Sequence, residues 1–478
     1  MPDALVCSKL NEACGVCGGF AAGQPLAYLT GLALYALQHR GQESAGIVAG
    51  DGRGGRLWHR RGLGLVSEVF PRTNDLKEIP CRIAVGHVRY PYQQEEGCLG
   101  SSQPVVLRYR YGELAIGHNG RLINGPGLRA ELEAEGAIFQ TRTDSELLAH
   151  LVARQGAPDL EEALAAVVPR LKGGFSFIVT DGRRVIGLRD GYGLRPLSLA
   201  TLKGGGYYLA SETCAFDSIG AKFLRDVKPG EMILLDSTGI RSRQLVQRDR
   251  SAFCVFEYIY FARPDSNLLG KNVHLVRREL GRRLAREQPV EADLVSGVPD
   301  SSISAASGYA EESGLPNEMA LVKNRYIGRV FITPTREMRE QGADIKLNAV
   351  EKIVRDKRVV LIDDSIVRGT TSLKLVQLML RAGAKEVHLR ISAPPVIASC
   401  YYGIDMPADE ELILFNRTAD QVARYTGADS VAFLSMAGVA AAVGLPEDRL
   451  CWSCFNGDYP AGRPDQGGAD RHTNSSDR

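Results

Sequence analysis

Two adjacent carboxylates follow an apolar run and precede a loop of small residues in Val359–Thr371 (VVLIDDSIVRGTT). In open parallel sheets, ligands bind at the carboxyl ends of strands, and the backbone N–H groups at a helix start bind phosphate. Carboxylate oxygens suit a diol or Mg²⁺ bound to it, and glycine lets a ligand approach the backbone. We therefore expect a phosphate- and diol-binding site formed by Asp363, Asp364, Ser365, Gly369, Thr370 and Thr371, with both carboxylates at an exposed strand end. The alternative is a solvated strand end followed by an ordinary helix N-cap.

Two further loops carry residues of matching chemistry. Gly297–Ser302 (GVPDSS) follows another apolar run, and Lys323–Tyr326 (KNRY) provides two cations. Cationic side chains bind pyrophosphate through charge-assisted hydrogen bonds, so Lys323 and Arg325 are candidates for that role. A Walker-type phosphate loop is excluded, because no G-x-x-x-x-G-K-[ST] segment occurs in the chain.

A thiol lies near the N-terminus, at Cys14, and polar motifs follow it along the first half of the chain. These motifs are Gln38–Gly46 (QHRGQESAG), Gly86–Tyr90 (GHVRY), His118–Gly120 (HNG) and Thr143–Glu146 (TDSE). In this order they resemble the N-terminal-nucleophile (class II) glutamine amidotransferases. The 13 residues Val359–Thr371 resemble the phosphoribosyl pyrophosphate (PRPP) motif of type I phosphoribosyltransferases. From about residue 11 to residue 460, the chain resembles the amidophosphoribosyltransferases, which begin purine synthesis.

The resemblance implies a role for each residue of the glutamine site. Cys14 is the nucleophile once residues 1–13 are removed as a propeptide, because its freed α-amine, with a pKa near 8, accepts the proton of its own thiol. Asn119 and the backbone N–H of Gly120 form the oxyanion hole. Arg89 binds the α-carboxylate of glutamine, and Asp144 binds its α-ammonium group.

Two positions complicate this interpretation. Cys17 lies three residues after Cys14 and is an alternative nucleophile, but it occupies a position that is apolar in the family motif. Tyr92 stands where the family has a threonine near the bound glutamine, so the affinity or selectivity for glutamine is open. The histidines His39, His87 and His118 are expected to orient the backbone rather than transfer protons.

For the second half, the resemblance implies synthesis of 5-phosphoribosylamine. Ammonia from glutamine passes internally and displaces pyrophosphate from Mg²⁺-bound PRPP, with Ser301 as a third metal-associated position beside Asp363 and Asp364. The family also suggests a homotetramer that purine nucleotides inhibit. A PRPP-binding regulator and an ammonia-only paralogue with an impaired glutamine site remain alternatives.

Four cysteines of the second half form a separate group, namely Cys254, Cys400, Cys451 and Cys454. The last two make a C-x-x-C pair, and four thiolates bind either zinc or an iron–sulfur cluster. Spacing alone does not decide between them. The same positions match the branch of the amidophosphoribosyltransferases that carries a 4Fe-4S cluster and a propeptide, so the resemblance implies a 4Fe-4S cluster here.

The elements that position these residues differ between the two halves. From Cys14 to about Gly239, short apolar runs separated by glycine-rich turns predict mostly antiparallel sheets with few helices, among them Leu26–Gln38 and one that Thr143 and Glu146 begin as a capping box. From about Asn272, apolar runs alternate with helical segments, which indicates a parallel sheet.

The resulting fold class is α/β and α+β. We expect a propeptide at 1–13, an αββα glutamine amidotransferase domain at 14–240, a phosphoribosyltransferase domain at 250–456 and a disordered tail at 457–478. The αββα layering comes from the resemblance. The polar stretch Asp236–Arg250 is expected to link the two halves. Of the second-half runs, Asp293–Val298, the neighbourhood of Met319–Val322, Arg358–Ile362 and Val387–Ile391 are expected as strands, with helices at Val273–Glu287 and Thr371–Ala382.

Composition narrows the classes of partner. The chain has 58 basic and 56 acidic side chains, a net charge of +2, which gives no overall attraction to nucleic acid or anionic membranes. No stretch approaches the ~18 consecutive apolar residues of a membrane span, and residues 1–13 lack the apolar core of a secretory signal. We expect a cytoplasmic enzyme of small-molecule substrates, with cysteines that are catalytic, metal-binding or buried rather than disulfide-bonded.

Overall fold

The computed structural model describes residues 14–90, 99–324 and 347–464. Among these residues the chain forms two compact units. The first unit runs to Phe253 and also contains Cys400–Asp405 and the chain end from Tyr459. The second unit contains Cys254–Ser399 and Met406–Asp458. The expected propeptide lies outside the described residues, as does 465–478 of the expected tail.

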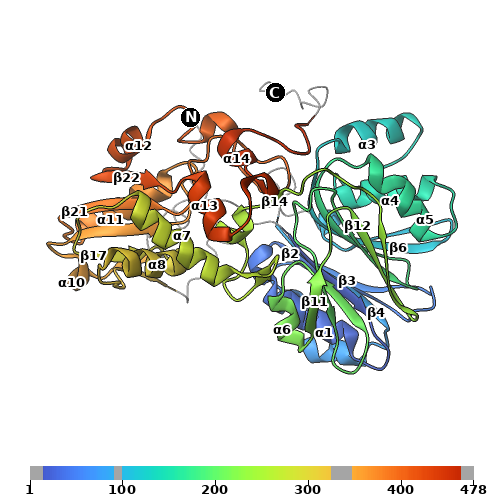
Figure 1. Ribbon diagram of the computed structural model, residues 1–478. Helices are drawn as coiled ribbons and strands as arrows, with labels where there is room; N and C mark the ends of the chain where they lie inside the picture. The colour runs from blue at the N-terminus through green and yellow to red at the C-terminus, as the bar shows by residue number, and fades with distance from the viewer. Residues whose placement is uncertain (1–13, 91–98, 325–346, 465–478) are drawn as a thin grey trace, which may run out of the picture. The chain divides into compact units, whose positions relative to one another are not determined.

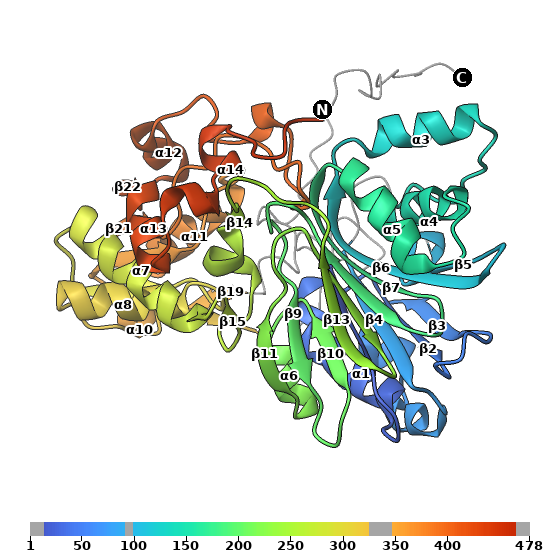
Figure 2. The same cartoon turned by 45° about the vertical axis from the view of Figure 1, so that its right-hand side comes forward.

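Two antiparallel sheets form the centre of the first unit (Figures 1 and 2). One sheet has the order β11-β9-β10-β1-β4-β2-β3 and the other β13-β12-β8-β7-β6-β5. Their strands are β1 (Gly15–Phe20), β2 (Ser44–Gly50), β3 (Trp58–Leu63), β4 (Ile83–Arg89), β5 (Val105–Tyr109), β6 (Gly112–Leu122), β7 (Gly173–Thr180), β8 (Val185–Arg189), β9 (Ser198–Thr201), β10 (Tyr207–Ala210), β11 (Lys222–Asp226), β12 (Glu231–Asp236) and β13 (Gly239–Gln244).

Helices cover the outer face of each sheet. On the first sheet these are α1 (Leu26–Ala36), α2 (Val66–Val69) and α6 (Cys214–Ile219), and on the second they are α3 (Gly125–Ala134), α4 (Asp144–Arg154) and α5 (Leu160–Val167). A third core lies between the sheets, where Val16 and Val85 pack with Ile178 and Ile233. The predicted αββα arrangement is confirmed.

Strand β1 shows why the first-half runs are apolar at nearly every position. Val16 points into the core between the sheets, whereas the next apolar side chain, Cys17, points into the core under the helices. Successive side chains of a strand face opposite sides, so a strand buried on both faces needs no polar alternation. Cys17 is thus a core residue, and burial raises its pKa to about 12.

Helix α4 begins as expected, although only half of the predicted capping box forms. The Thr143 hydroxyl accepts a hydrogen bond from the Glu146 N–H at 3.3 Å. The Glu146 carboxylate instead accepts from the N–H groups of Gln140 and Thr141, at 2.8 and 2.6 Å. The carboxylate therefore holds the loop before the helix rather than the N-cap residue.

A parallel sheet with the order β17-β20-β21-β22 forms the second unit and confirms that prediction. Its strands are β17 (Leu294–Gly297), β20 (Arg358–Asp363), β21 (Glu386–Ile391) and β22 (Ser430–Phe433), and the helices around them are α7 (Val273–Glu287), α8 (Ile303–Ser313), α10 (Glu351–Val354), α11 (Thr370–Arg381), α12 (Ala419–Thr426) and α13 (Met436–Val443). Short pieces complete it, namely β14 (Phe253–Cys254), β15 (Asn267–Leu268), β16 (Lys271–Asn272), β23 (Leu450–Cys451) and α14 (Ser453–Asn456).

The strand expected near Met319–Val322 is not part of the parallel sheet. Strand β18 (Leu321–Lys323) pairs antiparallel with β19 (Leu347–Ala349) instead. Val322 is exposed, so this apolar run does not form a doubly buried strand. The fourth parallel strand is β22, which we did not predict from the sequence.

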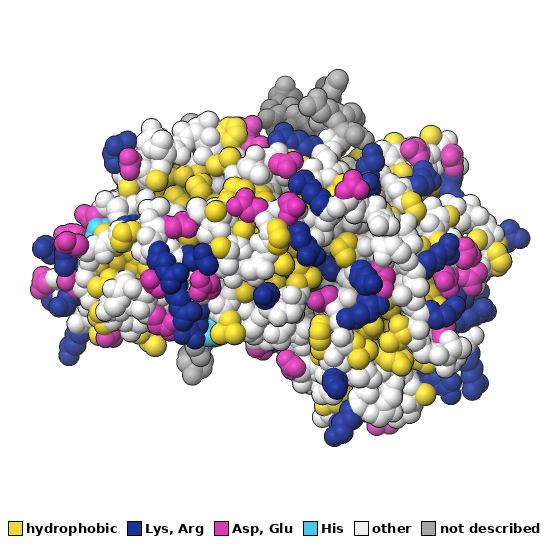
Figure 3. Space-filling model, in the orientation of Figure 1, with side chains coloured by type: hydrophobic (Ala, Val, Ile, Leu, Met, Phe, Trp, Pro, Cys, Tyr) yellow, Lys and Arg dark blue, Asp and Glu magenta, His cyan; other side chains and the backbone are white. Residues whose placement is uncertain are grey.

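The stretch Asp236–Arg250, expected to link the halves, contains β13 at the edge of the second sheet of the first unit. Its side chains are mostly exposed, which explains the polar sequence of this edge strand. On the face of the molecule that Figure 3 shows, basic and acidic side chains are interspersed, in keeping with the balanced composition. No helix in the described part of the chain is both long and apolar enough to cross a membrane.

Candidate active sites

Cys14 directly precedes β1, which lies between β10 and β4 in the first sheet. Its thiol contacts the Tyr90 carbonyl, with 3.9 Å between Sγ and O. Burial raises the pKa of this thiol, an effect that the Tyr90 carbonyl contact and the nearby Arg89 and Arg40 only partly oppose. A nucleophilic role for Cys14 therefore requires a base close to the sulfur.

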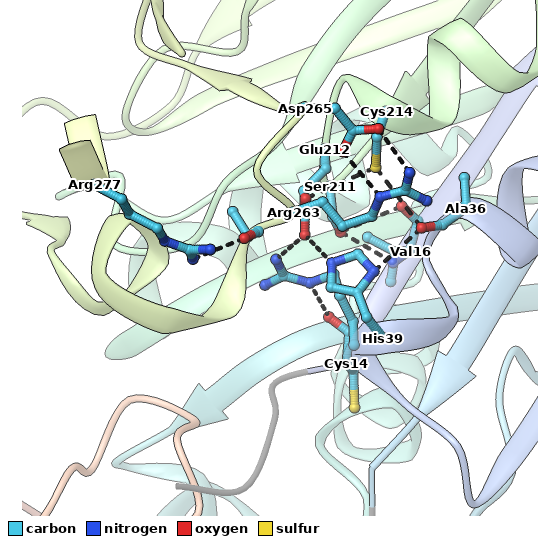
Figure 4. A network of polar contacts seen from close by, with 12 residues as sticks. Cys14, Val16, Ala36, His39, Ser211, Glu212, Cys214, Arg263, Asp265 and Arg277 are labelled. Carbon is cyan, nitrogen blue, oxygen red and sulfur yellow. Dashed lines mark hydrogen bonds and ion pairs between the residues drawn. The ribbon is translucent and has the colours of Figure 1, made fainter. Parts of the chain in front are cut away.

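A buried ionic network fixes the backbone of Cys14 (Figure 4). Arg40 Nε donates to the Cys14 carbonyl at 3.1 Å. The buried Glu212 carboxylate accepts from Arg40 Nη1 at 2.6 Å and from His39 Nε2 at 2.7 Å. Burial alone would raise the pKa of Glu212, but the charges of His39 and Arg40 hold it well below its usual range. The carboxylate is therefore ionised.

Asn119 carries the strongest sign of a ligand site in the first unit. Its side chain is fully buried on β6, and neither its amide nitrogen nor its amide oxygen has a hydrogen-bond partner among the described residues. A buried polar group without partners costs about 1–3 kcal/mol. A bound molecule that accepts a hydrogen bond from the amide would remove this penalty, which explains why a polar side chain is buried here.

The next residue, Gly120, has a conformation and surroundings that exclude a side chain. Its φ is +131°, and a Cβ atom would lie 2.0 Å from the Gly174 carbonyl oxygen on β7. The strand pairing that sets this distance aligns Gly120 with Phe175. Glycine is required here because of both the φ angle and the close approach.

His87 orients the backbone next to Asn119, as predicted. Its Nε2 donates to the His118 carbonyl at 2.8 Å. Burial lowers the pKa of His87 to about 3, so the ring is neutral and carries its proton on Nε2. The backbone of His118 has a second partner, because its N–H donates to Gln103 Oε1 at 2.8 Å. Ser145 Oγ donates to the same oxygen at 2.7 Å.

We expect His87→Gln to weaken the pH dependence of folding stability. The folded pKa lies below the unfolded value of about 6.5, so the unfolded chain binds a proton that the folded chain does not. The stability provided by neutral His87 is thus complete above about pH 6.5 and is lost as the pH falls toward 3. At about 1.4 kcal/mol per pKa unit, the loss at pH 5 is roughly 2 kcal/mol.

Urea unfolding at pH 7.5 and pH 5.0, followed by tryptophan fluorescence, measures this difference. Glutamine at position 87 retains a donor for the His118 carbonyl but does not titrate. His150→Gln, at a partly exposed histidine, is the control for replacing a histidine by glutamine. Equal pH dependence in wild type and His87→Gln would contradict the assignment.

Arg89 and Asp144 each contact a defined partner. Arg89 ends β4 and forms a buried ion pair with Glu43. Asp144 begins α4, and its Oδ2 accepts from the Leu122 N–H at 2.8 Å. Both side chains therefore have fixed positions at strand and helix ends. Tyr92, the departure from the family motif, lies outside the described residues.

The two carboxylates of the predicted phosphate loop lie at the carboxyl end of β20. We expected them to be exposed, but they are buried. Asp363 and Asp364 are 2% and 1% exposed. Hydroxyl groups from the loop after β17 cover them: Ser302 Oγ donates to Asp363 at 3.3 Å, and the Ser301 hydroxyl donates to Asp364. Ser365 Oγ also donates to Asp364, at 2.8 Å. The expectation of an exposed strand end was wrong because the neighbouring parallel strand brings this loop over the carboxylates.

The rest of the loop leads into a helix, as the sequence predicted. Gly369 is the N-cap of α11 with a φ of +76°, and a Cβ atom there would lie 2.4 Å from Ile413 Cδ1. Thr370 and Thr371 are the first residues of this 12-residue helix. Their N–H groups belong to the first turn, where no earlier carbonyl of the helix is available to accept. The geometry suits an anion at the start of α11.

A cleft of about 690 Å³ lies beside the loop that follows β17, with Asp300, Lys323 and Asn324 among its lining residues. Lys323 forms an ion pair with Asp300. The cleft does not include Asp363 or Asp364 in its lining. Arg325, the second predicted cation, lies outside the described residues.

Hard oxygen donors at the end of β20 fit the chemistry of Mg²⁺. This ion is commonly held by one or two carboxylates together with substrate phosphates and water. Asp363 and Asp364 provide two buried carboxylates, with the hydroxyl of Ser301 bonded to one of them. Across the described residues, however, no group of three or more His, Cys, Asp or Glu side chains is gathered as a metal site.

The backbone brings three of the predicted cluster cysteines, Cys254, Cys451 and Cys454, toward one another within the second unit, although the side chains do not form such a group. Cys254 lies on β14, which pairs with β23, the strand that carries Cys451. Cys454 follows on α14, and these three thiols are buried. The Ala398 N–H, two residues before Cys400, donates to the Cys454 carbonyl at 3.2 Å. This backbone arrangement fits a shared ligand, whereas the side-chain placement does not itself define one.

Comparisons with known proteins agree with both halves of this description. A family model described as a glutamine amidotransferase domain matches residues 95–218. A second family model, described as a phosphoribosyl transferase domain, matches residues 274–395.

Whole-chain relatives are also found. The amidophosphoribosyltransferase of Bacillus subtilis (strain 168) is 46% identical over 456 residues, which is 94% of each chain. That of Staphylococcus aureus (strain MRSA252) is 46% identical over 459 residues, 95% of this chain and 92% of that one. A solved structure of the B. subtilis glutamine PRPP amidotransferase, complexed with ADP and GMP, has a TM-score of 0.87 at 45% identity and covers 93% of this chain and 97% of that one. Another, of the allosteric regulatory enzyme of purine biosynthesis, has a TM-score of 0.89 at 45% identity, covering 95% and 97%. The chain belongs to the amidophosphoribosyltransferase family.

Proposed function

We propose that the chain makes 5-phosphoribosylamine, glutamate and pyrophosphate from PRPP, glutamine and water, the first step of purine synthesis. As a family member, the chain is a glutamine amidotransferase and a phosphoribosyltransferase. The observation that carries the glutamine half is the buried Asn119 amide, whose polar atoms lack partners among the described residues. The buried carboxylates before the α11 N-terminus carry the PRPP half.

In the glutamine site, removal of residues 1–13 provides the base that the buried thiol needs. The α-amine of Cys14 takes the thiol proton, and the thiolate attacks the side-chain amide carbon of glutamine. Asn119 Nδ2 and the Gly120 N–H donate to the resulting oxyanion. The intermediate collapses to a thioester and ammonia, which leaves with the proton that the amine had taken. Water then hydrolyses the thioester to glutamate, and Arg89 and Asp144 hold the two ends of the amino acid throughout.

In the second site, ammonia attacks C1 of the ribose and pyrophosphate leaves. Asp363 and Asp364 orient the ribose hydroxyls, while Ser365, Gly369, Thr370 and Thr371 bind the 5′-phosphate at the start of α11. Lys323 and Arg325 bind the leaving pyrophosphate. Ser301, Asp363 and Asp364 would hold Mg²⁺, which would neutralise charge on the pyrophosphate. Positioning and charge stabilisation account for catalysis, since no covalent intermediate is needed.

A single assay tests this function. The purified protein is incubated with glutamine and PRPP, and glutamate and pyrophosphate are measured together. Equal amounts of the two products, each dependent on both substrates, are expected. Binding of PRPP without turnover, with either glutamine or ammonia as nitrogen source, would instead support a regulator, and turnover with ammonia alone would support an ammonia-only paralogue.

We further propose that Cys254, Cys400, Cys451 and Cys454 bind a 4Fe-4S cluster. The pairing of β14 with β23 and the backbone contact beside Cys400 support this assignment, as does the match of the four positions to the cluster-bearing branch. Protein purified without oxygen should be brown and contain about four irons per chain. A colourless protein with one zinc ion per chain would contradict the cluster.

Substitution distinguishes cluster ligands from other thiols. Cys454→Ser should lower the iron content, remove the visible absorbance and destabilise the second unit. Cys81→Ser, at a half-buried thiol of the first unit, is the matched control and should leave iron content and colour unchanged.

Regulation, assembly and location complete the proposal. The B. subtilis relative was solved with ADP and GMP, which supports inhibition of this chain by purine nucleotides. The family suggests a homotetramer. We place the enzyme in the cytoplasm, because a catalytic thiol and thiolate ligands need a reducing compartment.

A further inference from the structure

Six residues from the second half of the sequence, Cys400–Asp405, belong to the first unit. Within this segment Tyr402 is buried, with 2% of its surface exposed. Gly403 has a φ of +109°. A segment inserted into a core from such a distant part of the chain is stable only if specific contacts hold it, so its partners show what it supports.

The segment packs directly on Gly120. A Cβ atom on Gly403 would lie 2.7 Å from Gly120 Cα and 2.8 Å from the Gly120 carbonyl carbon. On its other side Gly120 approaches Gly174, and a Cβ atom on Gly174 would in turn lie 3.0 Å from Tyr402 Cβ. Strand β7 and the Tyr402–Gly403 backbone thus enclose Gly120 from two directions.

Side chains of the first unit fix this backbone in place. Arg195, which is 1% exposed, donates from Nε to the Tyr402 carbonyl at 3.0 Å. The Arg195 N–H donates to the buried Asp190 carboxylate at 3.2 Å, which anchors the loop that carries the arginine. The carbonyl that precedes Gly403 is therefore held by a buried and anchored cation.

The ring of Tyr402 anchors the same segment from its far end. Its hydroxyl donates to the Gly462 carbonyl at 2.8 Å and accepts from the Ala461 N–H at 2.9 Å. The ring also lies against the ring of Tyr459, with 6.0 Å between centroids. Residues 457–464, the described start of the expected disordered tail, thus include positions that hold Tyr402.

We propose that Tyr402 and Gly403 are positioning residues for the oxyanion hole, a role that rests on the proposed function of Asn119 and Gly120. Neither residue contacts the reacting atoms. They set the position of the Gly120 backbone, whose N–H must point at the developing oxyanion. Displacements of about 1 Å around a reacting centre reduce rates by as much as ~10²-fold.

Gly403→Ala tests the role by moving Gly120. Carbon atoms pack at about 3.5–4.0 Å, so a methyl group 2.7 Å from Gly120 Cα must displace one backbone by roughly 1 Å. We expect kcat for glutamine hydrolysis to fall by roughly 10- to 100-fold with little change in KM. Ammonia-dependent synthesis should remain at the wild-type rate, which also establishes that the variant is folded.

Gly112→Ala is the matched control for backbone strain. Gly112 begins β6, the strand of Gly120, and has a φ of +130°, but no atom lies within 4 Å of its added Cβ. It therefore suffers comparable strain without pressing on a neighbour, and its glutamine kcat should stay close to wild type. Equal losses of glutamine kcat in Gly112→Ala and Gly403→Ala would show that general backbone strain causes the effect, which would overturn the proposal.

The γ-semialdehyde of glutamate provides a readout that a structural role would not change. Its aldehyde forms a tetrahedral adduct with a cysteine thiolate, and the adduct oxygen occupies the oxyanion hole. Gly403→Ala should weaken semialdehyde inhibition by about the same factor as kcat, whereas competitive binding of glutamate should change little. A rise in KM with unchanged kcat and unchanged semialdehyde inhibition would contradict the proposal.

Tyr402→Phe keeps the proposal testable if Gly403→Ala does not fold. It removes both hydrogen bonds of the hydroxyl but retains the ring, and a smaller, severalfold loss of glutamine kcat is expected. Wild-type kcat in every folded variant at these two positions would overturn the inference and leave the proposed function intact. Failure of wild-type protein to hydrolyse glutamine would instead reject the proposed function.

Discussion

Cys14→Ser is expected to abolish glutamine-dependent synthesis while added ammonia still yields pyrophosphate from PRPP. The serine hydroxyl is a much weaker nucleophile than a thiolate, and loss of a nucleophile of this kind lowers turnover by at least ~10³-fold. The second site does not use the thiol, because it consumes ammonia from either source. The measurement compares pyrophosphate release with glutamine and with ammonium chloride. Cys81→Ser is the control and should retain both activities.

The same experiment should also identify the N-terminal residue of the mature protein. Mass spectrometry of the active protein should show Cys14 as the first residue, because only a free α-amine serves as the base for its thiol. An active protein that retains residues 1–13 and hydrolyses glutamine would exclude the N-terminal-nucleophile mechanism. Loss of ammonia-dependent synthesis in Cys14→Ser would show that the two half-reactions are not separable.

Replacing Asp363 and Asp364 together by asparagine should eliminate synthesis with both nitrogen sources. Asparagine has the shape of aspartate but not its charge, so the ribose and Mg²⁺ lose their charged partners. Because both carboxylates are buried and hydrogen-bonded, some loss of stability will accompany the change. Circular dichroism and the melting temperature must therefore be compared with each single variant.

Asp356→Asn provides the control for that experiment. Asp356 is an exposed aspartate shortly before β20, at the opposite end of the strand, and its φ of +59° is one that asparagine tolerates. The rate of synthesis by the Asp356→Asn variant should equal that of the wild-type protein. Substantial activity in the folded double variant, measured with ammonia and saturating PRPP, would contradict the assignment of the two carboxylates.

Local patterns predicted the elements whose stability is local. The run RVVLI became the first five residues of β20, and the helix Val273–Glu287 was predicted with its observed bounds. Both predictions succeeded because strand burial and helix periodicity depend on neighbouring residues. The order of motifs also identified Cys14, Asn119 and Gly120 as candidates. The polar edge strand β13 was not predicted, since its exposed side chains carry no apolar signal.

Contacts between distant residues were beyond sequence reasoning. The burial of Asp363 and Asp364 depends on hydroxyl groups about 60 residues earlier in the chain. His39 and Arg40 fell in a recognised motif, but their partner Glu212 lies more than 170 residues away and had no signal of its own. The same holds for Arg195 and Tyr402, which are 207 positions apart.

The return of Cys400–Asp405 into the first unit limits how this protein can be divided. A fragment that ends at Phe253 would contain every residue to which we assign glutamine chemistry, yet it would lack the backbone that packs on Gly120. We therefore expect this contiguous fragment, taken alone, to hydrolyse glutamine more slowly than the whole chain does.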